Sequence, residues 1–365
     1  MRHGRAYNAM GFIDADAHVD ETPETWDYMD PSDVLYKPIL LDARGWGYLG
    51  PDIPPHPLWL IGGNVRLKRY RDDEITGTTQ ATRELMDVGA RLRHMDELGF
   101  DAQVIYPTLF LHAVTAQAEV EAAVHGAYNR WLADKTAWTG GKLRWAYLPS
   151  VLSIEKSAAE LEWAKAHGAC AVFKKGVEYN RRASDPYFFP LYAEAERLDL
   201  PICFHQGEGS LASNVGQSNS GPFASMAIYN VLAAFNHLAS AAVPDRFPRL
   251  RFGFIEAGAS WVPYEIKVAG MRGQAARHPY DFKTGFLQHH NFYVTCDTED
   301  DIRMLVDQYG AEDNLMIGTD YGHRDPSHEL AAHQVVTEMG ERGELSSEVA
   351  RKITSENARR FYGLP

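Results

Sequence analysis

The sequence predicts an α/β protein in which eight parallel strands alternate with helices and close into a distorted (β/α)₈ barrel of the TIM type. Short apolar segments alternate with longer segments of helical periodicity, which is the pattern of repeated βαβ units. Eight such apolar segments occur, the number of strands in this barrel. No glycine-rich dinucleotide fingerprint follows the first of them, which disfavours a doubly wound open sheet. With 365 residues and no obvious linker, we expect a single domain over residues 1–365.

The expected strands are short and apolar, and most end at a polar residue. They are Phe12–His18, Asp101–Pro107, Leu143–Pro149, Ala169–Gly176, Pro201–Gln206, Leu250–Gly258, Asn291–Asp297 and Leu315–Asp320. The segments between them carry apolar residues at helical spacing. The expected helices are Arg83–Leu98, Ala118–Trp138, Ser153–His167, Tyr187–Leu198, Ser225–Ala242, one from about Val262, Asp300–Tyr309 and Ser346–Tyr362.

A long segment, residues 19–82, separates the first two strands. It is rich in proline and aromatic residues, including Trp26, Trp46 and Trp59, and shows neither helical nor strand periodicity. A long irregular segment within a compact domain usually has a function. We therefore predict an irregular insertion that covers the mouth of the barrel or a subunit interface, with its aromatic side chains buried.

Charge and composition exclude several classes of partner. The formal net charge is −13 without a dense block of Lys and Arg, which argues against nucleic acid and anionic membranes. No apolar run is long enough to cross a bilayer. The three cysteines, Cys170, Cys203 and Cys296, lie in strand-like runs and are expected to be core residues. We expect a cytoplasmic protein that acts on a small molecule.

Ionisable residues stand at the ends of the expected strands, where the active site of such a barrel lies. They are Asp16, His18, Tyr106, Lys174, Lys175, His205, Glu256, Asp297 and Asp320. Asp16 and His18 are two residues apart and so point to the same side of a strand. Carboxylates and imidazoles suit zinc, manganese or iron. We predict that Asp16, His18 and Asp320, with His205, bind one divalent metal ion and leave a position for water.

Each of these residues also has a structural interpretation. Asp320 by itself is compatible with an N-cap, and His205 with a hydrogen-bonded structural histidine. Their joint placement at strand ends favours the metal site. We further expect substrate contacts from Tyr106, Asp297 and His323, and from Lys175, since only one of the two adjacent lysines can face the barrel.

Several motifs together resemble the amidohydrolase superfamily. They are Asp-x-His after an Ile-Asp lead-in, His205 on the fifth strand, the segments 245–252 and 318–321, and the closing segment 355–363. They are most similar to the branch that includes the aminocarboxymuconate-semialdehyde and resorcylate-type decarboxylases. The resemblance implies a distorted (β/α)₈ barrel, a homodimer, and one zinc or manganese ion bound by Asp16, His18, His205 and Asp320.

Two positions depart from that family pattern. Asp16 stands where many members have a histidine. Glu256 stands where the decarboxylases usually have a histidine that serves as acid and base. We therefore expect first a metal-dependent hydrolase of a small cyclic or carboxylated substrate, with catalytic roles for Asp320, Glu256 and His205.

Two other functions remain open. The first alternative is a non-oxidative, metal-dependent decarboxylase of an aromatic or unsaturated acid, in which a protein acid delivers a proton to carbon. The second is a non-catalytic barrel that binds a ligand or partner through the aromatic insertion.

Overall fold

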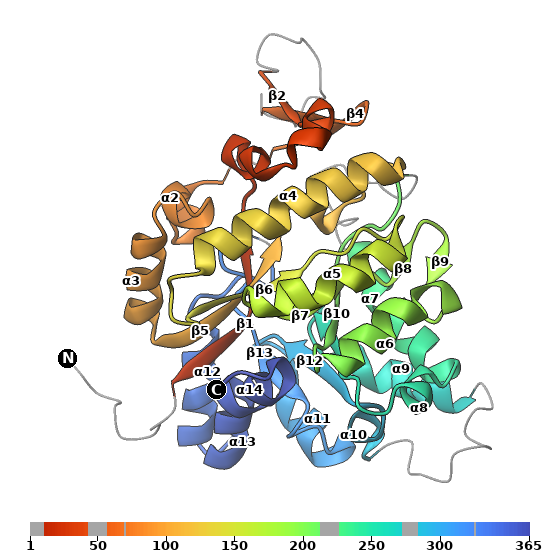
Figure 1. The fold of residues 1–365 in the computed structure, drawn as a ribbon. Helices are drawn as coiled ribbons and strands as arrows, with labels where there is room; N and C mark the ends of the chain where they lie inside the picture. The colour runs from red at the N-terminus through yellow and green to blue at the C-terminus, as the bar shows by residue number, and fades with distance from the viewer. Residues whose placement is uncertain (1–10, 43–56, 69–70, 212–225, 272–283, 325) are drawn as a thin grey trace, which may run out of the picture.

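Eight parallel strands form one sheet that curves into a nearly closed barrel (Figure 1). The structure is a computed structural model that describes residues 11–42, 57–68, 71–211, 226–271, 284–324 and 326–365. All eight predicted strands are confirmed, and they neighbour one another in chain order. They are β1 (Phe12–Val19), β5 (Phe100–Pro107), β6 (Leu143–Tyr147), β7 (Ala169–Lys174), β10 (Ile202–His205), β11 (Phe252–Ile255), β12 (Phe292–Cys296) and β13 (Leu315–Ile317).

The barrel closes where β1 meets the segment after β13. The His18 amide donates to the carbonyl of Tyr321 at 3.0 Å, and the Asp320 amide donates to the carbonyl of Asp16 at 2.9 Å. Gly318 permits this approach, because a Cβ atom there would lie 2.4 Å from the Cβ of Asp16. The first and last strands are therefore neighbours, although about 300 residues separate them.

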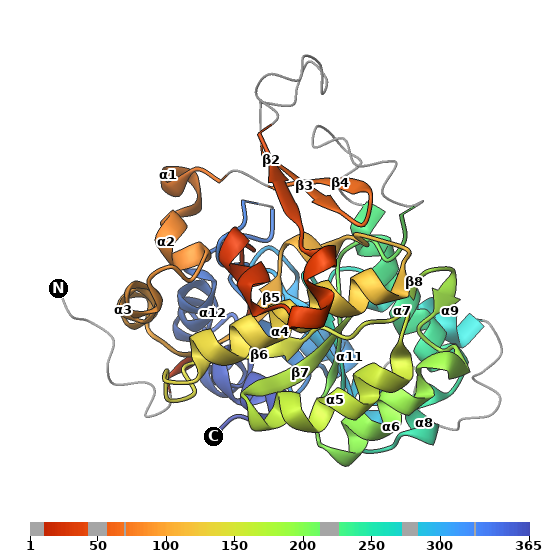
Figure 2. The ribbon, with the colours of Figure 1, turned by 45° about the horizontal axis from the view of Figure 1, so that its top comes forward.

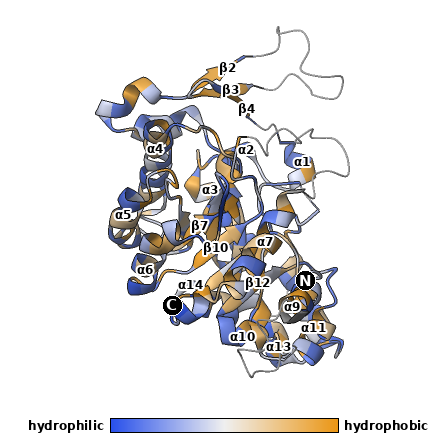
Figure 3. Cartoon of the chain, turned by 90° about the vertical axis from the view of Figure 1, so that its right-hand side faces the viewer, coloured by the Kyte–Doolittle hydropathy of each residue, from blue (hydrophilic) through white to orange (hydrophobic). Residues whose placement is uncertain are grey.

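Helices surround the strands and bury their apolar side chains. Figure 3 shows hydrophobic residues on the inner strands β7 and β10 and hydrophilic faces on the outer helices α5 and α6. The helices between strands are α3 (Val88–Leu98), α4 (Ala118–Thr136), α5 (Ile154–Ala166), α6 (Phe189–Arg197), α7 (Met226–Ser240), α8 (Val243–Arg246), α9 (Val262–Met271), α10 (Phe286–His290) and α11 (Ile302–Tyr309). None of the helices described here is long and apolar enough to cross a membrane.

Two helical predictions need correction. The helix expected over 83–98 begins only at Val88, as α3, because Leu85 has a left-handed backbone with φ of 47° and Asp87 caps the helix; a separate short helix, α2 (Gln80–Arg83), precedes it. An additional helix, α12 (Ala332–Glu341), precedes the closing helical segment, which runs through α13 (Ser347–Arg351), a π-helical turn (Lys352–Glu356) and α14 (Asn357–Tyr362).

The insertion after β1 is more regular than predicted. It contains an antiparallel sheet of β2 (Ile39–Leu41), β3 (Leu58–Ile61) and β4 (Asn64–Leu67), and the 3-10 helices η1 (Pro23–Tyr28) and η2 (Pro31–Tyr36). A short helix, α1 (Asp73–Thr76), follows the sheet. Gly62 and Gly63, both with positive φ, join β3 to β4, a turn that two consecutive glycines favour. The strands escaped prediction because they are only three or four residues long.

The insertion packs beside α4 at one end of the molecule (Figures 1 and 2). Lys135 Nζ pairs with Glu24 at 2.6 Å, and Arg130 Nε donates to the carbonyl of Tyr28 at 2.7 Å. Trp26 and Trp59 are buried against each other, as expected, with ring centroids 5.6 Å apart. Trp46 and the prolines at 51, 54 and 55 lie outside the described residues. A role over the barrel mouth or at a subunit interface stays a prediction.

A fully buried arginine supports the seam between β1 and the end of β13. Arg91 donates to Gln103 Oε1 at 2.8 Å and to the carbonyl of His18 at 3.3 Å, and its guanidinium lies 3.5 Å from the ring centroid of Tyr321. Gln103 in turn donates to Asp14 at 2.7 Å. The network therefore connects the backbone of β1 to the loop that follows β13.

We predict that Arg91→Ala lowers the free energy of unfolding by roughly 2–4 kcal/mol, because it leaves buried acceptors without their charged donor. Arg93→Ala is the matched control, because the Arg93 side chain is 68% exposed on the same helix and should change stability by no more than about 0.5 kcal/mol. Chemical denaturation measures both. Equal unfolding midpoints for the two variants would show that the network does not stabilise the seam.

Candidate metal centre

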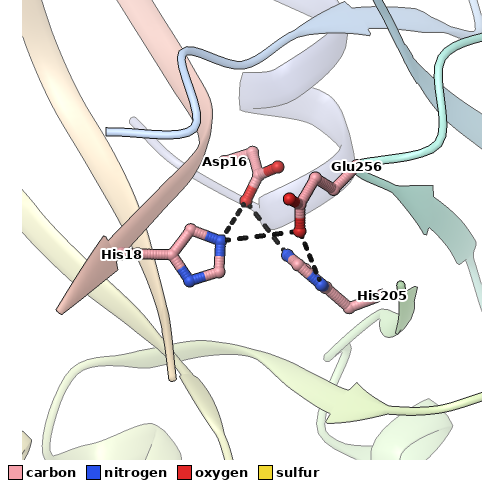
Figure 4. Close-up of side chains that lie close together, drawn as sticks. All are labelled: Asp16, His18, His205 and Glu256. Atoms are coloured by element: carbon pink, nitrogen blue, oxygen red, sulfur yellow. Dashed lines mark hydrogen bonds and ion pairs between the residues drawn. The ribbon is translucent and has the colours of Figure 1, made fainter. Parts of the chain in front are cut away.

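Six acidic and imidazole side chains meet at the carboxyl end of the barrel. Asp16 and His18 come from β1, His205 from the end of β10, Glu256 follows β11, and Asp320 and His323 follow β13. All six are buried, and the most exposed, Glu256, is only 4% exposed. Figure 4 shows four of them, Asp16, His18, His205 and Glu256, pointing toward one another.

The imidazole of His18 lies among three carboxylates. Its Nε2 is 3.4 Å from Asp16 Oδ1, 3.5 Å from Asp320 Oδ1 and 3.9 Å from Glu256 Oε2. Its Nδ1 is 3.0 Å from the carbonyl of Pro107, which can only accept, so Nδ1 carries the proton.

In the neutral ring, the lone pair on Nε2 therefore faces carboxylate oxygens. Burial lowers the pKa of His18 and so favours this neutral form. Nε2 has no hydrogen-bond partner among the described residues. A divalent cation fits between these acceptors, because each would become a ligand.

His205 brings a second imidazole to the same carboxylates. Its Nε2 lies 3.3 Å from Asp16 Oδ1, and its Nδ1 lies 3.3 Å from Glu256 Oε2 and 3.0 Å from the carbonyl of Gln206. Burial opposes ionisation of Asp16, but the charge that His205 carries when protonated, together with hydrogen bonds from the His18 and His205 rings, outweighs it and holds the pKa of Asp16 below its usual value. Asp16 is thus a carboxylate at neutral pH, the form that binds metal.

The six residues divide into two overlapping groups that could each hold an ion, Asp16–His18–His205–Glu256 and His18–Glu256–Asp320–His323, with ligand atoms within 4.8 Å of one another. In the second group, His323 Nδ1 lies 2.7 Å from Asp320 Oδ1, and the His323 ring stacks on His18 at 3.8 Å. The four ligands predicted from sequence are divided between the groups. Their assignment stays a prediction, and the geometry adds Glu256 and His323 as neighbours.

Two of the carboxylates stand on left-handed backbone. Glu256 has φ of 56° and Asp320 has φ of 50°. Such conformations cost free energy for residues other than glycine and concentrate at functional sites. The Glu256 amide donates to Thr295 Oγ1 at 2.9 Å, which helps to fix this turn. Both strands therefore end in sharp turns that direct a carboxylate into the site.

Tyr106 and Asp297, two of the predicted substrate contacts, differ in which part of the side chain is available near the cluster. The Tyr106 hydroxyl bonds to the hydroxyl of Tyr362 at 2.8 Å, so its ring, centred 5.0 Å from that of His205, is the part that faces the histidines. Asp297 is half-buried at the end of β12, where burial and then the charge of Asp300 raise its pKa to about 6.

The third and fourth predicted contacts are more deeply buried. Lys175 donates to the carbonyl of Phe110 at 2.9 Å. His323 belongs to the cluster itself, and its Nε2 lies 2.9 Å from Thr108 Oγ1. Substrate contact by any of the four residues stays a prediction.

One residue of the site was not predicted. Ser327, in the loop after β13, has its Oγ 3.2 Å from Asp320 Oδ2 and 3.5 Å from Glu256 Oε1. A serine several residues beyond a strand carries no sequence signal except its place in a βα loop, where active-site residues of such barrels gather.

Solved structures of other proteins share this fold over nearly its whole length. An amidohydrolase from Mycobacterium avium subsp. paratuberculosis K-10, map2389c, is 19% identical, with 98% of this chain and 100% of that chain aligned and a TM-score of 0.77. The 5-carboxyvanillate decarboxylase LigW from Sphingomonas paucimobilis is 16% identical, with 98% of this chain and 100% of that chain aligned and a TM-score of 0.66.

A 5-carboxyvanillate decarboxylase from Novosphingobium aromaticivorans was solved with manganese and 4-hydroxy-3-methoxy-5-nitrobenzoic acid. It is 16% identical, with 100% of this chain and 98% of that chain aligned and a TM-score of 0.65. At these identities the likeness concerns the fold. The amidohydrolase family model (Amidohydro_2) matches residues 13–364. This match covers all eight strands and the six clustered side chains, and the chain belongs to the amidohydrolase family.

Proposed function

We propose that this protein is a divalent metal-dependent, non-oxidative decarboxylase of an aromatic or unsaturated acid. The observation that supports metal binding is the buried cluster in which His18 Nε2 faces three carboxylates. The decarboxylases that share the fold, one of them solved with manganese and a nitrobenzoic acid, support decarboxylation over the hydrolysis that the sequence favoured first.

In this proposal Asp16, His18, His205 and Asp320 hold the ion, which is Mn²⁺ or Zn²⁺. Bound there, it supplies a Lewis acid that orients the substrate carboxylate and an adjacent oxygen. The protein side chains keep these ligands deprotonated and in place. His18 and His205 each direct one ring nitrogen to a backbone carbonyl, which fixes the tautomer that leaves the other nitrogen for binding.

Glu256 is the proposed proton donor. Its carboxyl group contacts His205 on one side and Ser327 on the other, and it lies beside the carboxylates that would bind metal. In the reaction, the protonated Glu256 gives its proton to the carbon that bears the substrate carboxylate. The bond to the carboxylate carbon then breaks, its electron pair returns to the ring or double bond, and carbon dioxide leaves. Solvent reprotonates Glu256.

One contact favours hydrolysis as a second candidate. The Asp320–His323 pair, at 2.7 Å, resembles a carboxylate–imidazole pair that can accept a proton from a water nucleophile. The two reactions leave different isotopes in the product. Decarboxylation in deuterium oxide places deuterium on product carbon, whereas hydrolysis in oxygen-18 water places oxygen-18 in the product.

We predict that His18→Asn abolishes stoichiometric metal binding, because it removes the imidazole at the centre of the carboxylates. His333→Leu is the matched control, since His333 is buried between Phe12 and Phe100 away from the cluster and should leave metal content unchanged. Elemental analysis after dialysis with Mn²⁺ or Zn²⁺ measures the bound metal. Wild-type metal content in His18→Asn would refute the assigned ligands.

We predict that the metal-loaded protein releases carbon dioxide from an aromatic acid and that Glu256→Gln reduces kcat by about 10²–10⁴-fold, because the amide cannot donate the proton. The acids to test are 5-carboxyvanillate and 2,6-dihydroxybenzoate, because decarboxylases that share the fold are named after them. Glu265→Gln, which changes a buried glutamate on α9 bonded to Asn236, should retain full turnover. Turnover of Glu256→Gln equal to that of Glu265→Gln would remove the proton-donor role, and oxygen-18 in the product without carbon dioxide release would support hydrolysis instead.

A further inference from the structure

Glu21, just after β1, is a buried carboxylate that the proposed reaction does not use. It is 3% exposed, and both of its oxygens accept hydrogen bonds from the backbone of the turn after β5. Oε1 accepts from the Thr108 amide at 3.2 Å and Oε2 from the Leu109 amide at 2.8 Å. The register of β1 and β5 ends at the pair Val19–Pro107, so this carboxylate crosses to the neighbouring strand just beyond the sheet. Burial of a carboxylate is unfavourable without such bonds, and here they fix the turn.

The turn that Glu21 holds contacts the metal cluster at two adjacent positions. The carbonyl of Pro107 accepts from His18 Nδ1 at 3.0 Å. The hydroxyl of Thr108 lies 2.9 Å from His323 Nε2. The rings of His18 and His323 stack on each other, with centroids 3.8 Å apart. Two neighbouring residues of one turn therefore orient two stacked imidazoles.

The direction of these two rings matters for the carboxylates of the cluster. His18 Nε2 lies 3.4 Å from Asp16 Oδ1 and 3.5 Å from Asp320 Oδ1. His323 Nδ1 lies 2.7 Å from the same oxygen of Asp320. A group that bonds to the far side of a metal-binding imidazole fixes its tautomer and ring direction, and loss of such a group typically weakens metal binding by about 10–100-fold. A displaced turn would misdirect both rings together.

We propose that Glu21 and Thr108 are positioning residues of the metal centre. Glu21 fixes the turn after β5, and the turn holds His18 through a carbonyl and His323 through the Thr108 hydroxyl. In this arrangement neither Glu21 nor Thr108 binds the metal ion. The inference rests on the metal centre of the proposed function, but it is independent of whether the reaction is decarboxylation or hydrolysis.

Titration of the metal-free protein with Mn²⁺ tests this role, because the electron paramagnetic resonance signal of the free ion gives the dissociation constant of the bound one. Glu21→Gln keeps the size of the side chain but replaces one acceptor oxygen by an NH₂ group, which cannot accept from a backbone N–H. The dissociation constant for Mn²⁺ should therefore rise about tenfold or more.

Glu121→Gln is the matched control. Glu121 is also 3% exposed and accepts from the amide of Leu152 at 2.8 Å, so it holds the loop after β6 in a similar way. The Pro149 carbonyl in that loop lies 3.0 Å from Nδ1 of His125, a histidine outside the cluster. This variant should bind Mn²⁺ within about twofold of the wild-type protein, because its loop orients no proposed ligand.

Thr108 provides a second test of the same turn. Thr108→Val removes the hydroxyl at nearly constant volume and should also raise the dissociation constant for Mn²⁺ about tenfold, whereas Thr108→Ser keeps the hydroxyl and should stay within about threefold of the wild-type protein. This pair still decides if Glu21→Gln fails to fold, because both variants keep the amide that Glu21 holds.

Unchanged Mn²⁺ affinity in Glu21→Gln and Thr108→Val would overturn the positioning role. Equal weakening by Glu21→Gln and Glu121→Gln, or by the two Thr108 variants, would also overturn it, because the loss would not depend on the orientation of the imidazoles. A wild-type protein that binds no metal would refute the metal centre and this inference with it. Failure to release carbon dioxide would count against the decarboxylase alone.

Discussion

The structure concentrates carboxylates and imidazoles at one buried point, the carboxyl end of the barrel. Three carboxylates and two imidazole nitrogens that hold lone pairs converge at the barrel end, nearly removed from water. Burial of facing acceptors is unfavourable unless a cation lies between them. This constraint accounts for the tautomers fixed by the carbonyls of Pro107 and Gln206, and for the left-handed turns at Glu256 and Asp320. The surrounding fold holds these groups together against their mutual repulsion.

The seam between β1 and β13 supplies much of that support. Asp14 accepts from the amide and the hydroxyl of Thr319, while Arg91 and Gln103 connect the same carboxylate to the backbone of His18. A second buried layer therefore lies directly behind Asp16 and Asp320. It consists of different residues from the site, which separates the positioning of the ligands from the chemistry that they perform.

The loop after β5 borders both the proposed metal centre and the buried Lys175 side chain. Its Thr108 contacts His323, and its Phe110 carbonyl accepts from Lys175. Glu21 accepts from the amides of Thr108 and Leu109 and so holds the start of the loop, and burial raises the pKa of this glutamate to about 8. One loop thus contacts both the metal cluster and Lys175.

Sequence periodicity alone determined the eight strands and their order, because apolar segments that alternate with helices leave few topologies other than a parallel barrel. It also identified Asp16, His18, His205, Glu256 and Asp320 as strand-end residues. It missed the β3–β4 hairpin, whose consecutive glycines are a signal too short to separate from a loop, and α12, which lies beyond the last strand. Only the tertiary structure decided that His323 and Ser327 reach the cluster, that Tyr106 turns its hydroxyl toward Tyr362, and that Lys175 bonds to the carbonyl of Phe110. These facts depend on side-chain direction and on contacts across the barrel, which a one-dimensional pattern does not contain.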